Sequence, residues 1–192
     1  MMHAVMVEQD ADPAPERGLE VVEFWRSIGP DGWFAKNDEV DRRFAEDFAG
    51  LHFAAARAQC MHWLDKPWAG LALILLLDQF PRNVFRGTGH AFATDPLALH
   101  SARRYLEAGH IESIDSPLRL FACLPFVHSE NMADLDEAVE LYGRYAPASL
   151  DWAVHHRDIV RKFGRFPHRN RSLGRQSTPA EQAFLDDGGF AG

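Results

Sequence analysis

Cysteine is scarce in this chain, and the few thiols argue against a disulfide framework or a zinc site. The 192 residues include two cysteines, Cys60 and Cys123, which lie far apart in apolar surroundings. Structural zinc sites use closely spaced cysteine or histidine pairs, and disulfide-rich domains carry larger sets of cysteines. We therefore expect both thiols to be small buried side chains in a reducing compartment.

Positive charge is in deficit over the chain as a whole. Lys and Arg total 20 against 28 Asp and Glu, which gives a net charge of −8 at pH 7. Such a surface does not attract nucleic acid or an anionic membrane. One segment differs, because Arg157 to Arg175 holds seven basic residues and a single acid, Asp158. A local basic segment in an acidic protein favours a small anion over a long polyanion, and the alternative is a set of solvated surface charges.

Long hydrophobic runs are also missing. The strongest apolar run, Ala69 to Leu77, is too short for a bilayer, which needs roughly 20 apolar residues. The first residues lack the basic region followed by an apolar region that marks a signal peptide. The expected location is therefore the cytoplasm, without membrane contact.

The chain lacks the period-two alternation of β-branched residues that indicates strands, and threonine and isoleucine are few. Helical spacing recurs along the sequence instead, so the predicted fold is all-α with roughly eight or nine helices in stacked antiparallel pairs. Residues 1–18 contain Pro13, Pro15 and several acids, which predicts a mobile N-terminal extension. Residues 19–192 are expected to form a single helical domain.

Several helix ends are predicted from single residues. The nearly all-apolar stretch 68–79 predicts a central core helix, which Pro81 is expected to end because proline disfavours a helical conformation at the residue before it. Later helices are expected to begin at Asp95-Pro96, Ser116-Pro117 and Thr178-Pro179, where a capping residue precedes a proline. Glu181 follows Thr178 at the spacing of a capping box.

Three polar motifs follow apolar runs, and each contains a proline. They are Asp78-Gln79-Phe80-Pro81-Arg82-Asn83, Leu124-Pro125-Phe126-Val127-His128-Ser129-Glu130, and Phe163-Gly164-Arg165-Phe166-Pro167-His168-Arg169-Asn170 continued by Leu173-Gly174-Arg175. Each motif would be presented at a helix end. We interpret the three as walls of one site.

The histidines near these motifs are candidates for proton transfer. His156 falls on one helical face with Trp152, Ile159, Val160 and Phe163, which places it on the core side. Histidine with a carboxylate partner acts as a general base or acid near neutral pH. The predicted catalytic residues are His156, His128 and Glu130. The alternative for His156 is a core histidine with satisfied hydrogen bonds.

The ligand-binding candidates are arginines and the polar residues beside them. A guanidinium group binds a carboxylate or phosphate through two parallel hydrogen bonds. The predicted ligand-binding residues are Asp78, Gln79, Arg82, Asn83, Arg165, His168, Arg169, Asn170 and Arg175. The alternative is that the arginines cap the C-terminal carbonyls of helices and that Asp78 only holds an arginine in place.

Several common signatures are absent from the sequence. It has no His-Glu-x-x-His motif, EF-hand loop, Gly-x-Ser-x-Gly elbow, P-loop or dinucleotide-binding glycine fingerprint. We therefore predict no metal and no cofactor.

The three motifs, taken with His156, resemble the bacterial family numbered 924 among the domains of unknown function. The resemblance covers residues 20–186, nearly the whole chain. It implies an all-α fold similar to tetratricopeptide-repeat-like helical arrays. It implies no established activity, because the family is named for the lack of one.

These observations favour a polar pocket at converging helix ends that binds a small anionic ligand bearing phosphate or carboxylate and is equipped for proton transfer. The alternative is a tetratricopeptide-repeat-like interaction module that binds a peptide, such as an acidic C-terminus, without enzymatic activity. A third interpretation is a structural network of helix caps. The sequence leaves the oligomeric state open and is compatible with a homodimer.

Overall fold

The computed structural model describes residues 13–190 and contains only helices in that range, which confirms the all-α prediction. The α-helices are α1 (Glu16–Ile28), α2 (Asp38–Ala56), α3 (Pro67–Val84), α4 (Asp95–Glu107), α5 (Arg119–Val127), α6 (Met132–Tyr145), α7 (Leu150–Phe163) and α8 (Pro179–Asp186). Short 3-10 helices join them: η1 (Met61–Asp65), η2 (Gly89–Phe92), η3 (His110–Ser113), η4 (Ser116–Leu118), η5 (Pro147–Ser149) and η6 (Pro167–Arg169).

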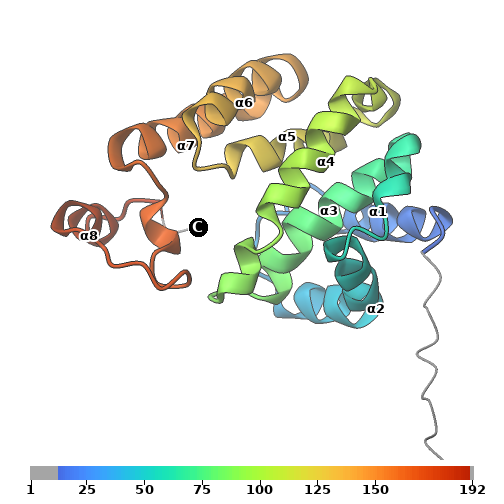
Figure 1. The fold of residues 1–192 in the computed structure, drawn as a ribbon, viewed down its shortest axis with the longest axis horizontal. Helices are drawn as coiled ribbons and strands as arrows, with labels where there is room; N and C mark the ends of the chain where they lie inside the picture. The colour runs from blue at the N-terminus through green and yellow to red at the C-terminus, as the bar shows by residue number, and fades with distance from the viewer. Residues whose placement is uncertain (1–12, 191–192) are drawn as a thin grey trace, which may run out of the picture.

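The helices follow one another through space in chain order, from α1 and α2 at one end to α7 and α8 at the other (Figure 1). Consecutive helices α3 to α7 each pack against the next. This arrangement fits stacked helix pairs, and the tetratricopeptide-like geometry stays a prediction. Of the predicted extension, residues 1–12 lie outside the described part of the chain, while Glu16–Gly18 already belong to α1. No described helix is long and apolar enough to cross a membrane.

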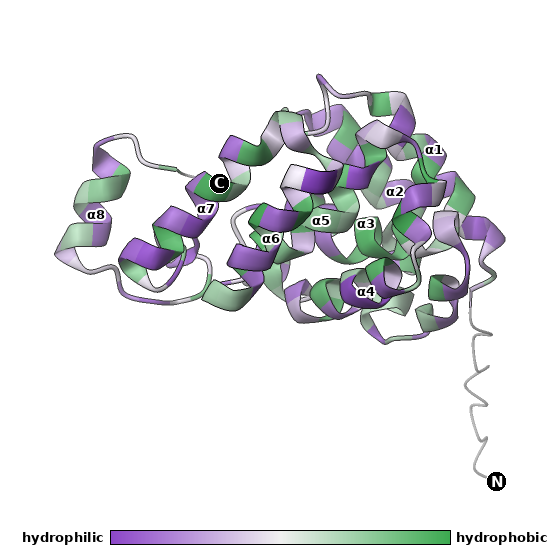
Figure 2. Cartoon of the chain, turned by 90° about the horizontal axis from the view of Figure 1, so that it is seen from above, coloured by the Kyte–Doolittle hydropathy of each residue, from purple (hydrophilic) through white to green (hydrophobic). Residues whose placement is uncertain are grey.

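Helix α3 is the centre of the main hydrophobic core. It packs against α1, α2, α4 and α5, and its strongly hydrophobic surface is enclosed by these neighbours (Figure 2). Every residue from Ala69 to Pro81 is buried. At Gly70 a β-carbon would lie 2.8 Å from the ring of Tyr105, so glycine is required for the close approach of α3 and α4.

Helix α3 does not end before Pro81, as the sequence predicted, but continues through it to Val84. Proline lacks the N–H that would bond to the carbonyl four residues earlier, which here belongs to Leu77. The hydroxyl of Thr94 donates to that carbonyl oxygen at 2.5 Å. A side chain from the next connection thus replaces the missing backbone donor, and the last turn of α3 persists.

The predicted helix starts have mixed outcomes. Thr178 and Glu181 form the expected capping box at α8. Asp95 is wrong as a cap, because it is the first residue of α4 and Thr94 precedes it; its carboxylate is bonded to arginines instead. Ser116 is also wrong as a cap, because it is the first residue of η4. Asp115 precedes η4 but makes no capping hydrogen bond with its side chain, and α5 begins after η4.

A second, smaller hydrophobic cluster lies under the C-terminal helices. Its buried members are Leu135, Ile159, Val160 and Phe166, and partly buried side chains such as Phe184 and Phe190 pack against them. The main core involves α1 to α7, so the segment from Phe166 onward folds against a separate apolar surface. The first two polar motifs contain Phe80 and Phe126 of the main core, and the third contains Phe166 of the second cluster.

Candidate functional site

The site is built from the ends of several helices that are distant in sequence. The C-terminal turn of α3, the end of α5 and the start of α4 come from the main body, and α7 and η6 come from the C-terminal part. The sequence-predicted residues brought together here are Asp78, Gln79, Arg82, His128, His156, His168 and Arg169. The structure therefore brings residues of all three motifs close together, and their role as one site stays a prediction.

Asp78 and His128 form the buried centre of this cluster. Nδ1 of His128 lies 2.7 Å from Oδ1 of Asp78, and Nε2 of Gln79 donates to Oδ2 at 2.7 Å. Burial raises the pKa of Asp78, but the Arg82 guanidinium and His128 lower it more, so the carboxyl pKa lies below its ordinary value. Burial lowers the pKa of His128, and the charge of Arg82 lowers it further. Asp78 raises the pKa by less, so the pKa of His128 lies below its ordinary value. His128 is therefore neutral at pH 7.

The ionised carboxylate fixes the tautomer of His128. A carboxylate accepts only, so Nδ1 carries the proton and donates to Asp78. In the neutral ring Nε2 then holds the lone pair. This is the arrangement in which an aspartate orients a histidine for general-base chemistry at its other nitrogen.

Two arginines share one carboxylate beside this pair. Arg82 contacts Asp95 through Nη1 at 2.7 Å and Nη2 at 2.9 Å, and its Nη1 also lies 3.2 Å from Oδ1 of Asp78. Arg169 reaches Asp95 through a single contact from Nη1 to Oδ2 at 3.1 Å. The Arg169 guanidinium carbon lies over the rings of Phe92, at 4.7 Å, and Phe166, at 4.6 Å.

Arg169 is the least satisfied of these charged groups. Its side chain is 7% exposed, and its Nε is buried without a hydrogen-bond partner among the described residues. Burial, followed by repulsion from Arg82, lowers the pKa of Arg169 to about 10, although Asp95 acts in the opposite direction. A buried donor without a partner costs about 1–3 kcal/mol, so this position is unfavourable unless something accepts from Nε.

His156 and His168 complete the cluster as neutral rings. Nδ1 of His156 donates to the backbone carbonyl of Trp152 at 2.9 Å, which leaves the lone pair on Nε2. Burial lowers the pKa of both histidines to about 3, and neighbouring positive groups, with Arg169 among them, add to the effect. Nδ1 of His168 is buried with no hydrogen-bond partner in residues 13–190. The prediction that His156 faces the core is confirmed, whereas Trp152 is 46% exposed.

Glu130, Asn170 and Arg175 form a neighbouring clamp. Arg175 donates to both Glu130 oxygens, at 2.7 and 3.0 Å, and Glu130 Oε1 also accepts from the backbone N–H of Phe166 at 2.7 Å. Nε of Arg175 donates to Oδ1 of Asn170, which is buried. Burial raises the pKa of Glu130, but Arg175 and the Phe166 N–H lower it by more, so the pKa lies below its ordinary value and the carboxylate is ionised at pH 7. This clamp holds the 166–175 segment against the connection between α5 and α6, and catalysis by Glu130 stays a prediction.

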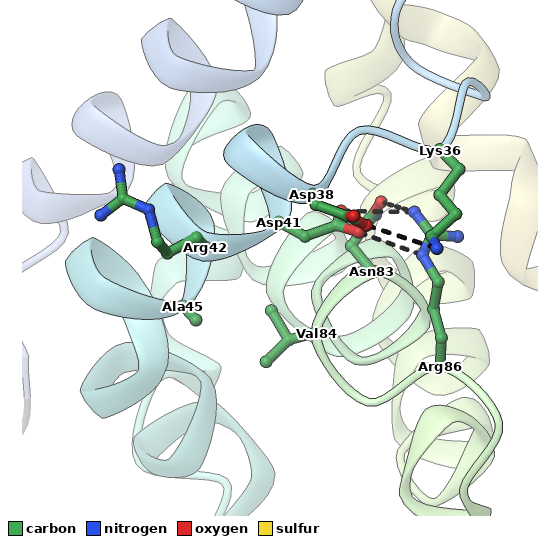
Figure 3. A pocket seen from close by; sticks show the side chains of 8 residues that line it. All are labelled: Lys36, Asp38, Asp41, Arg42, Ala45, Asn83, Val84 and Arg86. Atoms are coloured by element: carbon green, nitrogen blue, oxygen red, sulfur yellow. Dashed lines mark hydrogen bonds and ion pairs between the residues drawn. The ribbon is translucent and has the colours of Figure 1, made fainter.

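Arg165 and Asn83 lie apart from the cluster. Arg165 pairs with Glu181 at 2.6 and 2.9 Å, which ties the end of α7 to the capping box of α8. Asn83 donates to the carbonyl of Gln79 and accepts from Arg86. It faces a surface hollow of about 360 Å³, shown in Figure 3. The hollow is lined by Lys36, Asp38, Asp41, Arg42, Ala45, Asn83, Val84 and Arg86.

The charges around this hollow neutralise one another. Arg86 bonds to Asp41 and Lys36 lies 3.4 Å from Asp38 (Figure 3). Arg42 bonds to Glu39 and Glu46, so each cation has an acid partner. The residues lining this hollow include no buried polar group without a partner, such as Nε of Arg169, that could bind an ion. The histidine and arginine cluster is therefore the better candidate site.

Three residues of the site were not found from the sequence as site residues. Asp95 was interpreted as a helix cap, Phe92 carried no signal, and Tyr142 looks like any core aromatic. The Tyr142 hydroxyl is buried without a partner in the described chain, and burial, then Cys123 and Asp78, raises its pKa well above the ordinary value. The described residues contain no group of three His, Cys, Asp or Glu side chains placed to hold a metal ion.

Comparison with known proteins gives a consistent result. Residues 21–189 match the family described as "Bacterial protein of unknown function (DUF924)". The solved structure of ATU0120, a protein of unknown function from Agrobacterium tumefaciens, is similar with a TM-score of 0.87 and 45% sequence identity, over 90% of this chain and 98% of that one. No curated protein matches the chain. With the family model covering most of its length and a relative of this similarity, the chain belongs to the bacterial family of unknown function DUF924.

Proposed function

We propose that the cluster at the ends of α3, α5 and η6 binds a small anionic ligand bearing a carboxylate or phosphate. The observation that carries the proposal is the buried Nε of Arg169, which has no acceptor among the described residues. An anion placed there would accept a charge-assisted hydrogen bond, one of the stronger polar contacts in proteins. Its negative charge would also offset the repulsion from Arg82 that helps to lower the pKa of Arg169.

The balance of charges supports Arg169 as the anchoring residue. The other predicted arginines have close carboxylate contacts, because Arg82, Arg165 and Arg175 each bond to both oxygens of an acid. Arg169 has one contact to Asp95, an acid that Arg82 already engages. Its positive charge is the one least neutralised by the protein. His168, neutral and with an unpartnered Nδ1, adds a second polar atom beside it.

Proton transfer at this site would use His128. Asp78 holds Nδ1 of His128 as a donor, so Nε2 is free to accept a proton from a ligand. Attraction to Asp78 would stabilise the imidazolium formed in such a step. His156 is a second neutral ring in the same cluster, close enough to His128 that a positive charge on His128 lowers the pKa of His156. The geometry therefore supports binding with general-base capability.

The test is titration calorimetry with inorganic phosphate and acetate against wild type, Arg169→Gln and Arg169→Lys. Both substitutions remove Nε–H, and the lysine keeps the charge. Loss of a hydrogen bond to a charged group, about 1.5–3 kcal/mol, predicts at least about tenfold weaker binding. Arg171→Gln is the matched control, because Arg171 is exposed in the same segment.

Unchanged affinity in both Arg169 variants would reject the anion site. The alternative function, a peptide-binding module, predicts a different result: an acidic peptide would bind, and its affinity would survive Arg169→Gln.

We further propose a cytoplasmic location. Cys60 and Cys123 are both buried, as expected of thiols that serve as small core side chains.

A further inference from the structure

The ring of Phe190 occupies a cage of aromatic and histidine side chains next to the proposed site. Its centroid lies 4.6 Å from His156, 4.9 Å from His168, 5.3 Å from Trp152 and 6.2 Å from His155. The contacts with His168, Trp152 and His155 are nearly perpendicular, with interplanar angles of 86° to 88°. Such edge-to-face packing is the preferred geometry for aromatic rings.

A glycine turn brings Phe190 to this position. The chain after α8 turns back toward α7 (Figure 2). Gly188 has φ of 79°, a conformation that residues with a side chain rarely adopt. At Gly189 a β-carbon would lie 2.4 Å from the carbonyl oxygen of Phe184 and 2.6 Å from its ring. Both positions require glycine if Phe190 is to reach the cage.

The cage and the proposed anion site share residues. His156 and His168 contact the ring of Phe190 and also lie in the cluster around Arg169. The ring of Phe166 connects the two parts, because it lies 5.6 Å from His156 and from His168 and stacks under the Arg169 guanidinium at 4.6 Å. The rings of His156, His168 and Phe166 therefore form a continuous path between the cage and the Arg169 guanidinium.

We infer that this cage is the subsite for the aromatic ring of the ligand, and that Phe190 occupies it as an internal competitor. The inference rests on the proposed anion site and specifies the ligand class as a small aromatic acid. The acid group binds at Arg169, and the ring replaces that of Phe190 among Trp152, His156 and His168.

The contacts of Phe190 are suited to replacement. Phe190 is only partly buried, and its cage is open at Trp152, which is 46% exposed. Edge-to-face ring contacts are individually weak, so a ligand ring can exchange for the ring of Phe190. Because the occupied cage lowers the fraction of molecules that accept a ring, removal of Phe190 should tighten the apparent affinity for an aromatic acid.

The experiment measures acetate and phenylacetate by titration calorimetry against wild type, Phe190→Ala and Gly189→Ala. The two ligands share the carboxylate and differ in the ring. The first substitution empties the cage, and the second displaces the turn without changing a cage residue. Gly50→Ala is the control, since Gly50 lies in α2 and none of the described chain approaches within 4 Å of its β-carbon position. Circular dichroism verifies that each variant is folded.

The expected result is a gain of about fivefold or more in phenylacetate affinity for both cage variants, with acetate affinity unchanged. If acetate binds but phenylacetate gains nothing in either variant, the aromatic subsite is wrong and the anion site stands. If neither ligand binds to any variant and inorganic phosphate also fails, the anion site is rejected and the aromatic subsite with it.

Discussion

The continuation of α3 through Pro81 leads to a quantitative prediction about Thr94. The Thr94 hydroxyl bonds to the Leu77 carbonyl, which would otherwise have no donor because residue 81 is proline. Thr94 is 8% exposed and Leu77 is fully buried. The substitution Thr94→Val keeps the shape and removes the donor. A buried carbonyl without a partner costs about 1–3 kcal/mol, so we expect a loss of about 2 kcal/mol.

The second substitution, Pro81→Ala, tests whether this loss has the proposed cause. Alanine restores the backbone N–H, which can bond to the Leu77 carbonyl in the helical pattern. In that background Thr94→Val should cost about 1 kcal/mol less, and the difference is the coupling energy of the two positions. The cycle cancels the separate effect of proline on the unfolded chain.

Urea denaturation measures all four proteins. The midpoint should fall in Thr94→Val with an unchanged slope, and thermal unfolding should shift by about 4–8 °C for a loss of 2 kcal/mol in a chain of this size. Additive effects, within about 0.3–0.5 kcal/mol, would refute the idea that the threonine replaces the missing N–H.

The remaining predictions concern buried charge and capping. The pKa of His156 and His168 is lowered to about 3 in the folded state, so the unfolded chain binds more protons than the folded chain below about pH 6.5. The free energy of unfolding should therefore fall as the pH drops, by about 1.4 kcal/mol per pH unit for each histidine. The substitution His156→Gln should flatten the dependence of the urea midpoint on pH between 4 and 6. Asp78→Asn should lower the free energy of unfolding by about 3 kcal/mol at pH 7. Because the pKa of Asp78 is lowered in the folded state, the difference in stability between wild type and variant should shrink as the pH falls below about 4. A difference of the same size at pH 7 and pH 3 would contradict the ion pair. Thr178→Ala should cost about 1 kcal/mol through the lost cap, and an unchanged urea midpoint would contradict it.

The helix content and the position of several candidate residues at helix ends could be predicted from the sequence because they depend on local patterns. The apolar stretch of α3, the periodicity of α7 and the capping box of α8 act over a few residues, and the structure has all three. His128 and His168 follow Pro125 and Pro167 closely in sequence, which was enough to place them at helix ends.

The partners of the charged residues could not be predicted in the same way. Arg169 and Asp95 are 74 positions apart, and Arg175 and Glu130 are 45 apart. No local pattern identifies such pairs, so arginines that have carboxylate partners looked available for a ligand. Pro81 failed for a similar reason, because the donor that rescues its helix comes from Thr94 in another segment.

The sharing of Asp95 by Arg82 and Arg169 has a consequence for biosynthesis. A ribosome releases this chain from the N-terminus, so Asp95 and Arg82 emerge together and can pair as soon as α3 and α4 pack. Arg169 emerges only after 74 further residues, and Phe190 later still. The helical body can therefore form while the proposed ligand site is still incomplete. Binding of the proposed anionic ligand would report that synthesis has passed Arg169 and that the C-terminal segment has docked, so it would measure completed folding of this chain.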